Sequence, residues 1–394
     1  MDIDLSLHQQ EVITSILVWF KTPSRKPFIT LGGFAGTGKT TLIGYISQQL
    51  RKSNPELKVA FCSYTGKAVR VLGRKLKDAQ AVYPDDSVTT IHRLIYEPTL
   101  DDDGAIVGWS RKDIKEFKYG LIIVDEASMV NQAIWNDITQ YGVPILAVGD
   151  HGQLPPIEGR FNLMENPDLK LEEIYRQEKD NPIIFVSKMA RTRGIIPFME
   201  FGKGVVKMNR RDMDTQEFLS DLFMRYDDDT LVLVGYNNTR IKLNKAIRGL
   251  LGFEGEQPQV KDRVICLRNS YEHHIYNGMM GRIKSIETIT DDFGMYYKSK
   301  IALDEEGGYD FEGLISYNQF GAKETLHAEK TPEVDLFDFG YALTTHKAQG
   351  SQAKRVVVFE EKFANMDNDM WKKWLYTAVT RASEELYIIG DSLG

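Results

Sequence analysis

A complete phosphate-binding loop runs from Gly33 to Thr40 and fits the pattern G-x-x-x-x-G-K-[ST] without a mismatch. Such a loop wraps backbone N–H groups around the phosphates of a nucleotide, and the N-terminus of the following helix adds positive potential. Lys39 is expected to reach the β- and γ-phosphates, and the Thr40 hydroxyl is expected to hold Mg²⁺. The residues of this stretch that we expect to contact the nucleotide are Gly33, Ala35, Gly36, Thr37, Gly38, Lys39, Thr40 and Thr41.

An acidic pair, Asp125-Glu126, directly follows the apolar run 121–124. An aspartate in this position can orient Mg²⁺, and the glutamate after it can polarise the attacking water. Acidic pairs also occur at strand ends by chance, but a phosphate loop about 85 residues upstream favours a catalytic pair. Gln153, in the stretch 149–156, is placed to touch the γ-phosphate or the attacking water. These residues predict hydrolysis of a nucleoside triphosphate.

Three further polar residues lie where a ligand could meet the predicted elements. Gln9 precedes the phosphate loop, and its amide could donate to and accept from adenine; an exposed glutamine on a helix is the alternative. Thr65 and Lys67 follow the apolar run 59–62. The carboxyl ends of parallel strands bind ligands in open α/β sheets, although a solvated loop would have the same sequence.

The elements that must position these residues are alternating strands and helices. The expected strands of the first half cover residues 28–31, 59–62, 121–124 and 143–148. Short continuous apolar runs of this kind are typical of parallel strands covered on both faces. Because the double proline Pro155-Pro156 stops regular structure, we expect the first α/β domain to cover residues 1–158.

The second half repeats the α/β pattern without a second phosphate loop. Its apolar runs cover residues 231–234, 356–359 and 386–389. We therefore expect a second α/β domain, residues 159–257 and 331–394, that packs against the first and contributes residues to its nucleotide. Residues 258–330 contain short strand-like runs separated by glycines and aspartates, which predicts a small β-barrel inserted in the second domain.

Residues 96–113 interrupt the first α/β pattern. Asp103-Gly104 is a hairpin turn signal followed by apolar residues, which predicts a small inserted β-hairpin; an exposed loop is the alternative. Trp109 could stack on a base or could only anchor the hairpin to its own domain. In residues 341–351, hydroxyl groups and a lysine suit contacts with a phosphate backbone.

The composition is that of an ordinary globular protein, with 394 residues of which 42% are hydrophobic and 27% charged. No apolar run approaches the roughly 18 residues that a membrane span needs, and the acidic N-terminus lacks a signal-peptide pattern. Cys62 and Cys266 are too few for a disulfide framework or a zinc site, so a reducing cytoplasm is expected. The net charge of −7 does not favour nucleic acid but allows a local basic channel.

The order of these motifs resembles that of superfamily 1 helicases of the RecD/Dda type. The resembling stretches are residues 33–41, 63–68, 125–128, 148–156, 175–177, 341–351 and 375–382, nearly the whole chain in the family's order. Those at 149–156 and 345–350 resemble this branch rather than the UvrD/Rep branch. One departure is Ser63-Tyr64 before Thr65, where the family often has Ala-Pro.

The resemblance implies two RecA-like domains with ATP between them, a pin hairpin at 96–113 and an SH3-like barrel at 258–330. It implies ATP contacts from Gln9 and Gly350, and Mg²⁺ binding by Thr40 and Asp125. The residues implied to be catalytic are Lys39, Glu126, Gln153, Arg176 and Arg381. On their own the two arginines would be assigned to a solvated surface, but the family uses them to stabilise charge on the transferring phosphoryl group. The residues implied to contact DNA are Thr65, Lys67, His92, Trp109, Thr345 and His346.

The implied function is an ATP-dependent DNA helicase that moves 5′→3′ on single-stranded DNA, in replication, recombination or repair, inside a bacterial cell or a phage-infected host. Single-stranded DNA and fork or duplex junctions are the expected partners, a single-strand-binding protein is a further candidate, and no membrane is involved. We expect a monomer and, because no long N-terminal extension is present, no assembly of the RecBCD type. Two alternatives stay open: an ATP-dependent single-strand translocase that displaces proteins without efficient unwinding, and an NTP-dependent kinase, which would leave residues 341–351 and Arg381 unexplained.

Overall fold

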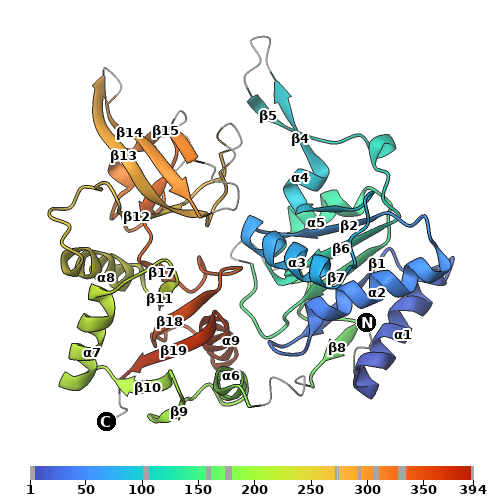
Figure 1. Cartoon of the computed structure of the whole chain (residues 1–394), viewed down its shortest axis with the longest axis horizontal. Helices are drawn as coiled ribbons and strands as arrows, with labels where there is room; N and C mark the ends of the chain where they lie inside the picture. The colour runs from blue at the N-terminus through green and yellow to red at the C-terminus, as the bar shows by residue number, and fades with distance from the viewer. Residues whose placement is uncertain are drawn as a thin grey trace. The chain divides into compact units, whose positions relative to one another are not determined.

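The chain forms two compact units, residues Met1–Phe185 and Val186–Gly394 (Figure 1). The computed structural model describes residues 5–100, 106–156, 161–173, 180–270, 273, 275–291, 294–304, 310–326 and 334–391. Within these residues, no helix has the length and apolar character that crossing a membrane requires.

The first unit is built on a sheet of six parallel strands in the order β3-β2-β6-β7-β1-β8. Its strands are β1 (Phe28–Gly33), β2 (Val59–Ser63), β3 (Ser87–Thr90), β6 (Leu121–Asp125), β7 (Ile145–Gly149) and β8 (Leu169–Leu171). The residues of β2, β6 and β7 are buried along the whole strand, which is why these segments are continuous apolar runs. The predicted α/β class with a parallel sheet is confirmed.

Helices cover both faces of this sheet. They are α1 (Leu7–Lys21), α2 (Lys39–Ser53), α3 (Gly66–Asp78), α4 (Ile91–Ile95) and α5 (Gln132–Thr139), with single turns η1 (Ile114–Glu116) and η2 (Ala127–Met129). One core contains Ile16, Ile43 and Leu76 from α1, α2 and α3, and the other contains Leu94 and Trp135 from α4 and α5. The two cores cover both faces of the sheet, and the carboxyl ends of its parallel strands lie along one edge.

Strand β8 extends the first unit beyond residue 158, where the sequence predicted its end. After the double proline the chain returns to the sheet, and Leu31 of β1 is paired in parallel with Leu169. The Asp168 carboxylate accepts hydrogen bonds from the backbone N–H and the hydroxyl of Thr30, at 3.0 and 2.9 Å, and fixes this return. A three-residue edge strand has too short a pattern to be recognised in the sequence.

A two-stranded antiparallel hairpin, β4 (Tyr96–Leu100) and β5 (Ile106–Arg111), projects from the first unit (Figure 1). Its register places Pro98 opposite Trp109. The Tyr141 hydroxyl donates to the carbonyls of Ile95 and Lys112, at 2.8 and 3.0 Å, and so holds both strands at their base. The predicted turn at Asp103-Gly104 lies outside the described residues.

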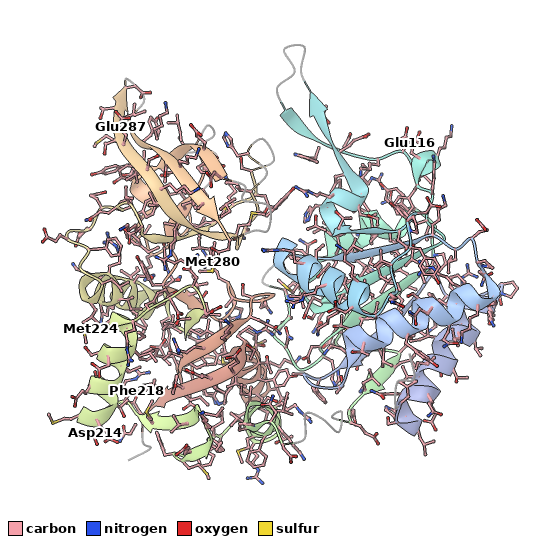
Figure 2. All side chains as sticks on the ribbon, in the orientation of Figure 1. Glu116, Asp214, Phe218, Met224, Met280 and Glu287 are labelled. Atoms are coloured by element: carbon pink, nitrogen blue, oxygen red, sulfur yellow. The ribbon has the colours of Figure 1, made fainter. Side chains whose placement is uncertain are left out.

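The second unit contains a six-stranded sheet in the order β17-β11-β18-β19-β10-β9, parallel except for β9. Its strands are β9 (Glu200–Gly202), β10 (Val205–Asn209), β11 (Thr230–Val234), β17 (Ala342–Thr344), β18 (Ala353–Phe359) and β19 (Ala382–Gly390). The accompanying helices are α6 (Pro182–Arg193), α7 (Met213–Met224), α8 (Asn237–Leu250) and α9 (Asn368–Val379). Phe218 of α7 joins the core, with its ring centroid 4.8 Å from that of Tyr387 (Figure 2).

A separate antiparallel sheet, which we call the β insertion, has the order β15-β14-β13-β12-β16. Its strands are β12 (Arg263–Cys266), β13 (Met280–Asp291), β14 (Gly294–Leu303), β15 (Asp310–Ser316) and β16 (Phe337–Phe339), with one turn η4 (Tyr317–Gln319) after β15. Asp335 exchanges backbone hydrogen bonds with Leu314 and Ser316, so the two edges of the sheet are linked. The last strand lies beyond residue 330, where the sequence predicted the end of the insertion.

Candidate functional site

The phosphate loop connects β1 to α2 at the carboxyl edge of the first sheet. Gly36 and Gly38 have φ angles of 78° and 79°, in the left-handed region that favours glycine. Gly38 is the N-cap of α2, and no side chain caps the first amides of this helix. These N–H groups are therefore available to an anion, as the predicted cradle requires.

Lys39 lies in the first turn of α2, with its ammonium folded back over the loop. Its Nζ donates to the carbonyls of Gly33 and Phe34, at 2.7 and 3.0 Å, and lies 3.9 Å from the Asp150 carboxylate. The ammonium therefore lies directly above the loop that would hold the phosphates.

Asp125 and Glu126 lie at the end of β6, separated from β1 only by β7. Burial, and next the Glu126 carboxylate, raise the pKa of Asp125 to about 6, while the Lys39 ammonium acts in the opposite direction. Glu126 adopts φ 54°, a left-handed conformation that is uncommon for a residue with a side chain. The pair therefore concentrates negative charge beside the phosphate loop, where a cation would lower its energy.

Asp150 is a site residue that the sequence analysis did not single out. It follows β7, is almost fully buried, and accepts a hydrogen bond from the backbone N–H of Gly152 at 2.9 Å. Its second oxygen faces both the Lys39 ammonium and the Gln153 amide, the latter at 3.4 Å. In the sequence, Asp150 could have been recognised from the Gly149-Asp150 pair that follows an apolar strand. However, only the strand order shows that this strand, β7, lies next to β1 and its phosphate loop.

Three buried oxygen atoms at this edge have no hydrogen-bond partner among the described residues: Glu126 Oε2, Ser128 Oγ and Gln153 Oε1. Buried polar atoms are nearly always satisfied in a folded protein, so each of these is expected to meet a ligand, a metal-bound water or the attacking water. Carboxylate and hydroxyl oxygens are also the groups that Mg²⁺ prefers. The residues present therefore fit a magnesium–nucleotide complex.

Gln9 lies beside the phosphate loop, and both ends of its amide are already bonded. Its Nε2 donates to the Thr37 carbonyl at 3.2 Å, and its Oε1 accepts from the backbone N–H of Ser6 at 3.0 Å. Ser6 and Gln9 form a capping box at the start of α1. In this structure Gln9 thus ties the first helix to the phosphate loop.

Two of the residues expected to contact DNA lie together at the edge of the first sheet. The register pairs Ser63 of β2 with Thr90 of β3, and Thr65 and His92 each lie two residues further on. The Thr65 hydroxyl caps α3, and burial lowers the pKa of His92. The side chain of Lys67 lies outside the described part of the chain.

The residues of the second unit that were expected to contact DNA are buried (Thr345) or half-buried (His346). Thr345 is fully buried, and its backbone N–H donates to the Val234 carbonyl at 3.0 Å. Burial lowers the pKa of His346, and Gly350 has a φ of 73°. Arg176 lies outside the described residues.

Arg381 follows α9 and is 2% exposed. Its guanidinium donates to the carbonyls of Thr377 and Ser351 at 3.0 and 3.3 Å, and to the Thr380 hydroxyl at 3.4 Å. These acceptors are neutral, and no carboxylate of the described residues forms an ion pair with it. Its positive charge is therefore not balanced within the described part of the second unit.

Comparison with known proteins shows which families the two halves of the chain resemble. Residues 18–159 match the model of the AAA domain family, and residues 339–389 match that of the UvrD-like helicase C-terminal domain. The chain is 23% identical to the ATP-dependent DNA helicase dda of Enterobacteria phage T4, over 98% of this chain and 99% of that protein. These matches agree with the resemblance of the chain's motifs to superfamily 1 helicases of the RecD/Dda type.

Another relative is longer than this chain. The ATP-dependent RecD2 DNA helicase of Deinococcus radiodurans is 26% identical over 92% of this chain, which spans about half of that protein (47%). Two solved structures of Pif1 helicases cover the whole chain. They are the Bacteroides enzyme with ADP-AlF3 and ssDNA (TM-score 0.53, 17% identity, 94% of that chain covered) and a Pif1 helicase at forked dsDNA (0.52, 19%, 93%). At these identities the likeness establishes the fold alone.

Proposed function

We propose that this protein is an ATP-dependent DNA helicase that translocates 5′→3′ along single-stranded DNA and unwinds duplex DNA. The observation that carries its ATP-hydrolysing part is the set of buried oxygens on Glu126, Ser128 and Gln153, which have no partner among the described residues and lie beside a complete phosphate loop. The direction of movement is taken from the RecD/Dda type. We propose further that the protein acts as a monomer in the cytoplasm on single strands and forks, where it meets single-strand-binding protein.

For the hydrolysis step, Thr40 and Asp125 would hold Mg²⁺, which when bound offsets negative charge on the phosphates. The Lys39 ammonium exchanges its loop carbonyls for phosphate oxygens, and Gln153 contacts the γ-phosphate. Glu126 accepts the proton of the attacking water, since its free Oε2 is buried at the strand end next to the loop. Asp150 keeps Lys39 and Gln153 in place from the other side.

The test is strand displacement on forked duplexes that carry either a 5′ or a 3′ tail, together with the ATPase rate with and without a single-stranded oligonucleotide. We expect displacement from the 5′-tailed substrate and an ATPase that the oligonucleotide stimulates. Stimulation without displacement would instead favour a translocase. An ATPase that does not respond to the oligonucleotide would contradict a DNA motor and favour a kinase.

Arg381→Ala is expected to lower kcat for ATP hydrolysis by about 10³-fold while ATP affinity changes little. Among the described residues the guanidinium has neutral acceptors alone, and we propose that its charge acts on the phosphoryl group in the transition state. Arg176→Ala is expected to behave in the same way. Steady-state ATPase assays and nucleotide titrations measure the two quantities.

The control for Arg381→Ala is Arg355→Ala, because Arg355 already pairs with Glu385 at 2.7 Å and should not affect turnover. Thermal melting shows whether the loss of the Arg381 hydrogen bonds unfolds the protein. A folded Arg381→Ala variant with unchanged kcat would remove this residue from the site.

We propose that the hairpin β4–β5 parts the DNA strands and that the β insertion is an SH3-like barrel over the DNA. Removing residues 99–108 keeps the Pro98–Trp109 pair and the base of the hairpin. This deletion is expected to abolish unwinding of a 5′-tailed duplex, while DNA-stimulated ATPase largely survives, because a wedge acts on the duplex and not on ATP. Trp109→Ala separately tests base stacking. Wild-type unwinding by the shortened protein would make the strand-separating role wrong.

A further inference from the structure

Helix α8 presents three polar side chains on its buried side: Arg240, Asn244 and Arg248, four residues apart. A spacing of four residues places them on one face of the helix, which we call the polar face of α8. Each is 5% exposed or less. Two buried guanidinium groups and a buried amide are unfavourable unless specific partners satisfy them, so the partners indicate what this face holds.

Asn244, in the middle of this face, binds the backbone where β17 begins. Its Oδ1 accepts from the N–H groups of Tyr341 and Ala342, at 3.1 and 2.8 Å, and its Nδ2 donates to the Ala342 carbonyl at 3.1 Å. Because β17 is the edge strand of the second sheet, this amide supplies the hydrogen bonds that a neighbouring strand would otherwise supply. The segment 341–351, which carries the proposed DNA contacts, therefore starts from a fixed point on α8.

Arg248, at one end of the polar face, holds the start of the β insertion. Its Nε and Nη2 form a fork with the Asp262 carboxylate, at 2.9 Å each. The Tyr341 hydroxyl donates to the same carboxylate at 2.8 Å and accepts from the backbone N–H of Arg263, the first residue of β12, at 3.1 Å. One fully buried carboxylate thus joins α8, the β insertion and the segment 341–351.

Arg240, at the other end of the face, holds the last strand of the β insertion. It pairs with Asp338 of β16, and Asp338 also accepts from the backbone N–H groups of Gly321 and Phe339 at 2.8 and 2.7 Å. Asp262, directly before β12, and Asp338 of β16 are therefore bonded to the same helix face, so both connections of the insertion are held by α8.

We propose that the polar face of α8 makes the β insertion and the segment 341–351 move as one body. The conformational change that accompanies ATP turnover is thereby transmitted to the insertion. Arg240, Asn244 and Arg248 are positioning residues, since they act through the backbone and carboxylates that they hold. This inference rests on the proposed helicase function. It implies that removing hydrogen bonds of the polar face of α8 uncouples ATP hydrolysis from DNA strand separation.

The test uses two variants that keep side-chain bulk. Asn244→Leu removes all three hydrogen bonds to the backbone of Tyr341 and Ala342, and Tyr341→Phe removes only the hydroxyl that joins Asp262 to Arg263. Lys245→Ala is the matched control on the exposed side of the same helix, where the ammonium pairs with the exposed Glu256. The readout is the number of base pairs opened per ATP hydrolysed on a 5′-tailed fork, beside the ATPase stimulated by single-stranded DNA.

We expect Asn244→Leu to lower the base pairs opened per ATP by about tenfold, Tyr341→Phe to lower them less, and Lys245→Ala to leave them unchanged. The DNA-stimulated ATPase should stay close to the wild-type rate in all three. A merely structural role would lower ATPase and unwinding in proportion. The number of base pairs opened per ATP would then be unchanged, and that outcome would overturn the inference.

A second measurement separates this inference from the proposed function. Hydrogen exchange of the backbone amides of β12 is followed with an oligonucleotide bound, before and after addition of a non-hydrolysable ATP analogue. We expect the analogue to change exchange in the wild type but not in Asn244→Leu. Equal responses would overturn the inference even if the wild type unwinds DNA. A wild type that opens no fork would overturn the proposed function, whatever the exchange shows.

Discussion

Lys39→Ala is expected to lower ATP hydrolysis by at least about 10²-fold while the fold stays intact. The Nζ atom lies between the carbonyls of Gly33 and Phe34 and the Asp150 carboxylate, so the variant removes the single positive charge that this part of the phosphate loop offers a nucleotide. Alanine is also a good helix former in the first turn of α2, which limits the structural cost. ATPase assays and circular dichroism measure the two effects.

Lys26→Ala is the matched control for Lys39→Ala. Lys26 also pairs with an aspartate, Asp168 at 3.1 Å. Because Lys26 precedes β1, it lies at the amino end of this strand, whereas the phosphate loop lies at the carboxyl end. Its removal should leave turnover unchanged. Wild-type turnover in a folded Lys39→Ala sample would refute the nucleotide site.

Glu126→Gln is expected to bind ATP almost normally but to hydrolyse it about 10²–10⁴-fold more slowly. Glutamine keeps the size of the side chain, but it cannot accept the proton of the attacking water. Asp125, to which we assign the metal, is unchanged, so nucleotide affinity should survive. Titration with a fluorescent ATP analogue measures binding, and single-turnover assays measure the chemical step.

The control for Glu126→Gln is Glu116→Gln, an exposed glutamate of η1 in the same unit (Figure 2). It makes the same chemical change away from the phosphate loop and should leave both quantities unchanged. If Glu126→Gln lost affinity as severely as turnover, the division between a metal ligand at Asp125 and a base at Glu126 would be wrong.

The local structure around the candidate site was predictable where it is encoded in one short stretch of sequence. The phosphate loop is a contiguous motif, and Gly36 and Gly38 lie at positive φ where the loop turns into α2. The strands that carry the site residues are buried on both faces, so they were recognisable as apolar runs. Gln9 shows a local signal that was not used: Ser6-x-x-Gln9 is a capping-box pattern, and it predicts an amide engaged with its own helix.

What the sequence could not predict depends on partners far away in the chain. Strand β8 has three residues and is defined only by its pairing with β1. On α8, polar and charged residues four apart (Arg240, Asn244 and Arg248) would ordinarily indicate a solvated face. Arg240 is buried because Asp338 lies beside it, although 98 residues separate the two in sequence. No periodicity in a single segment contains that information.

The path by which the β insertion leaves and re-enters its host sheet has an evolutionary consequence. Strands β12 and β16 are antiparallel neighbours, with Val264 opposite Phe339, and the Gly340 N–H donates to the Arg263 carbonyl at 2.8 Å. The exit and the return of the chain are thus adjacent. Because its two ends are adjacent, the β insertion can be lengthened, shortened or replaced in one genetic step without changing the strand order of the sheet into which it is inserted.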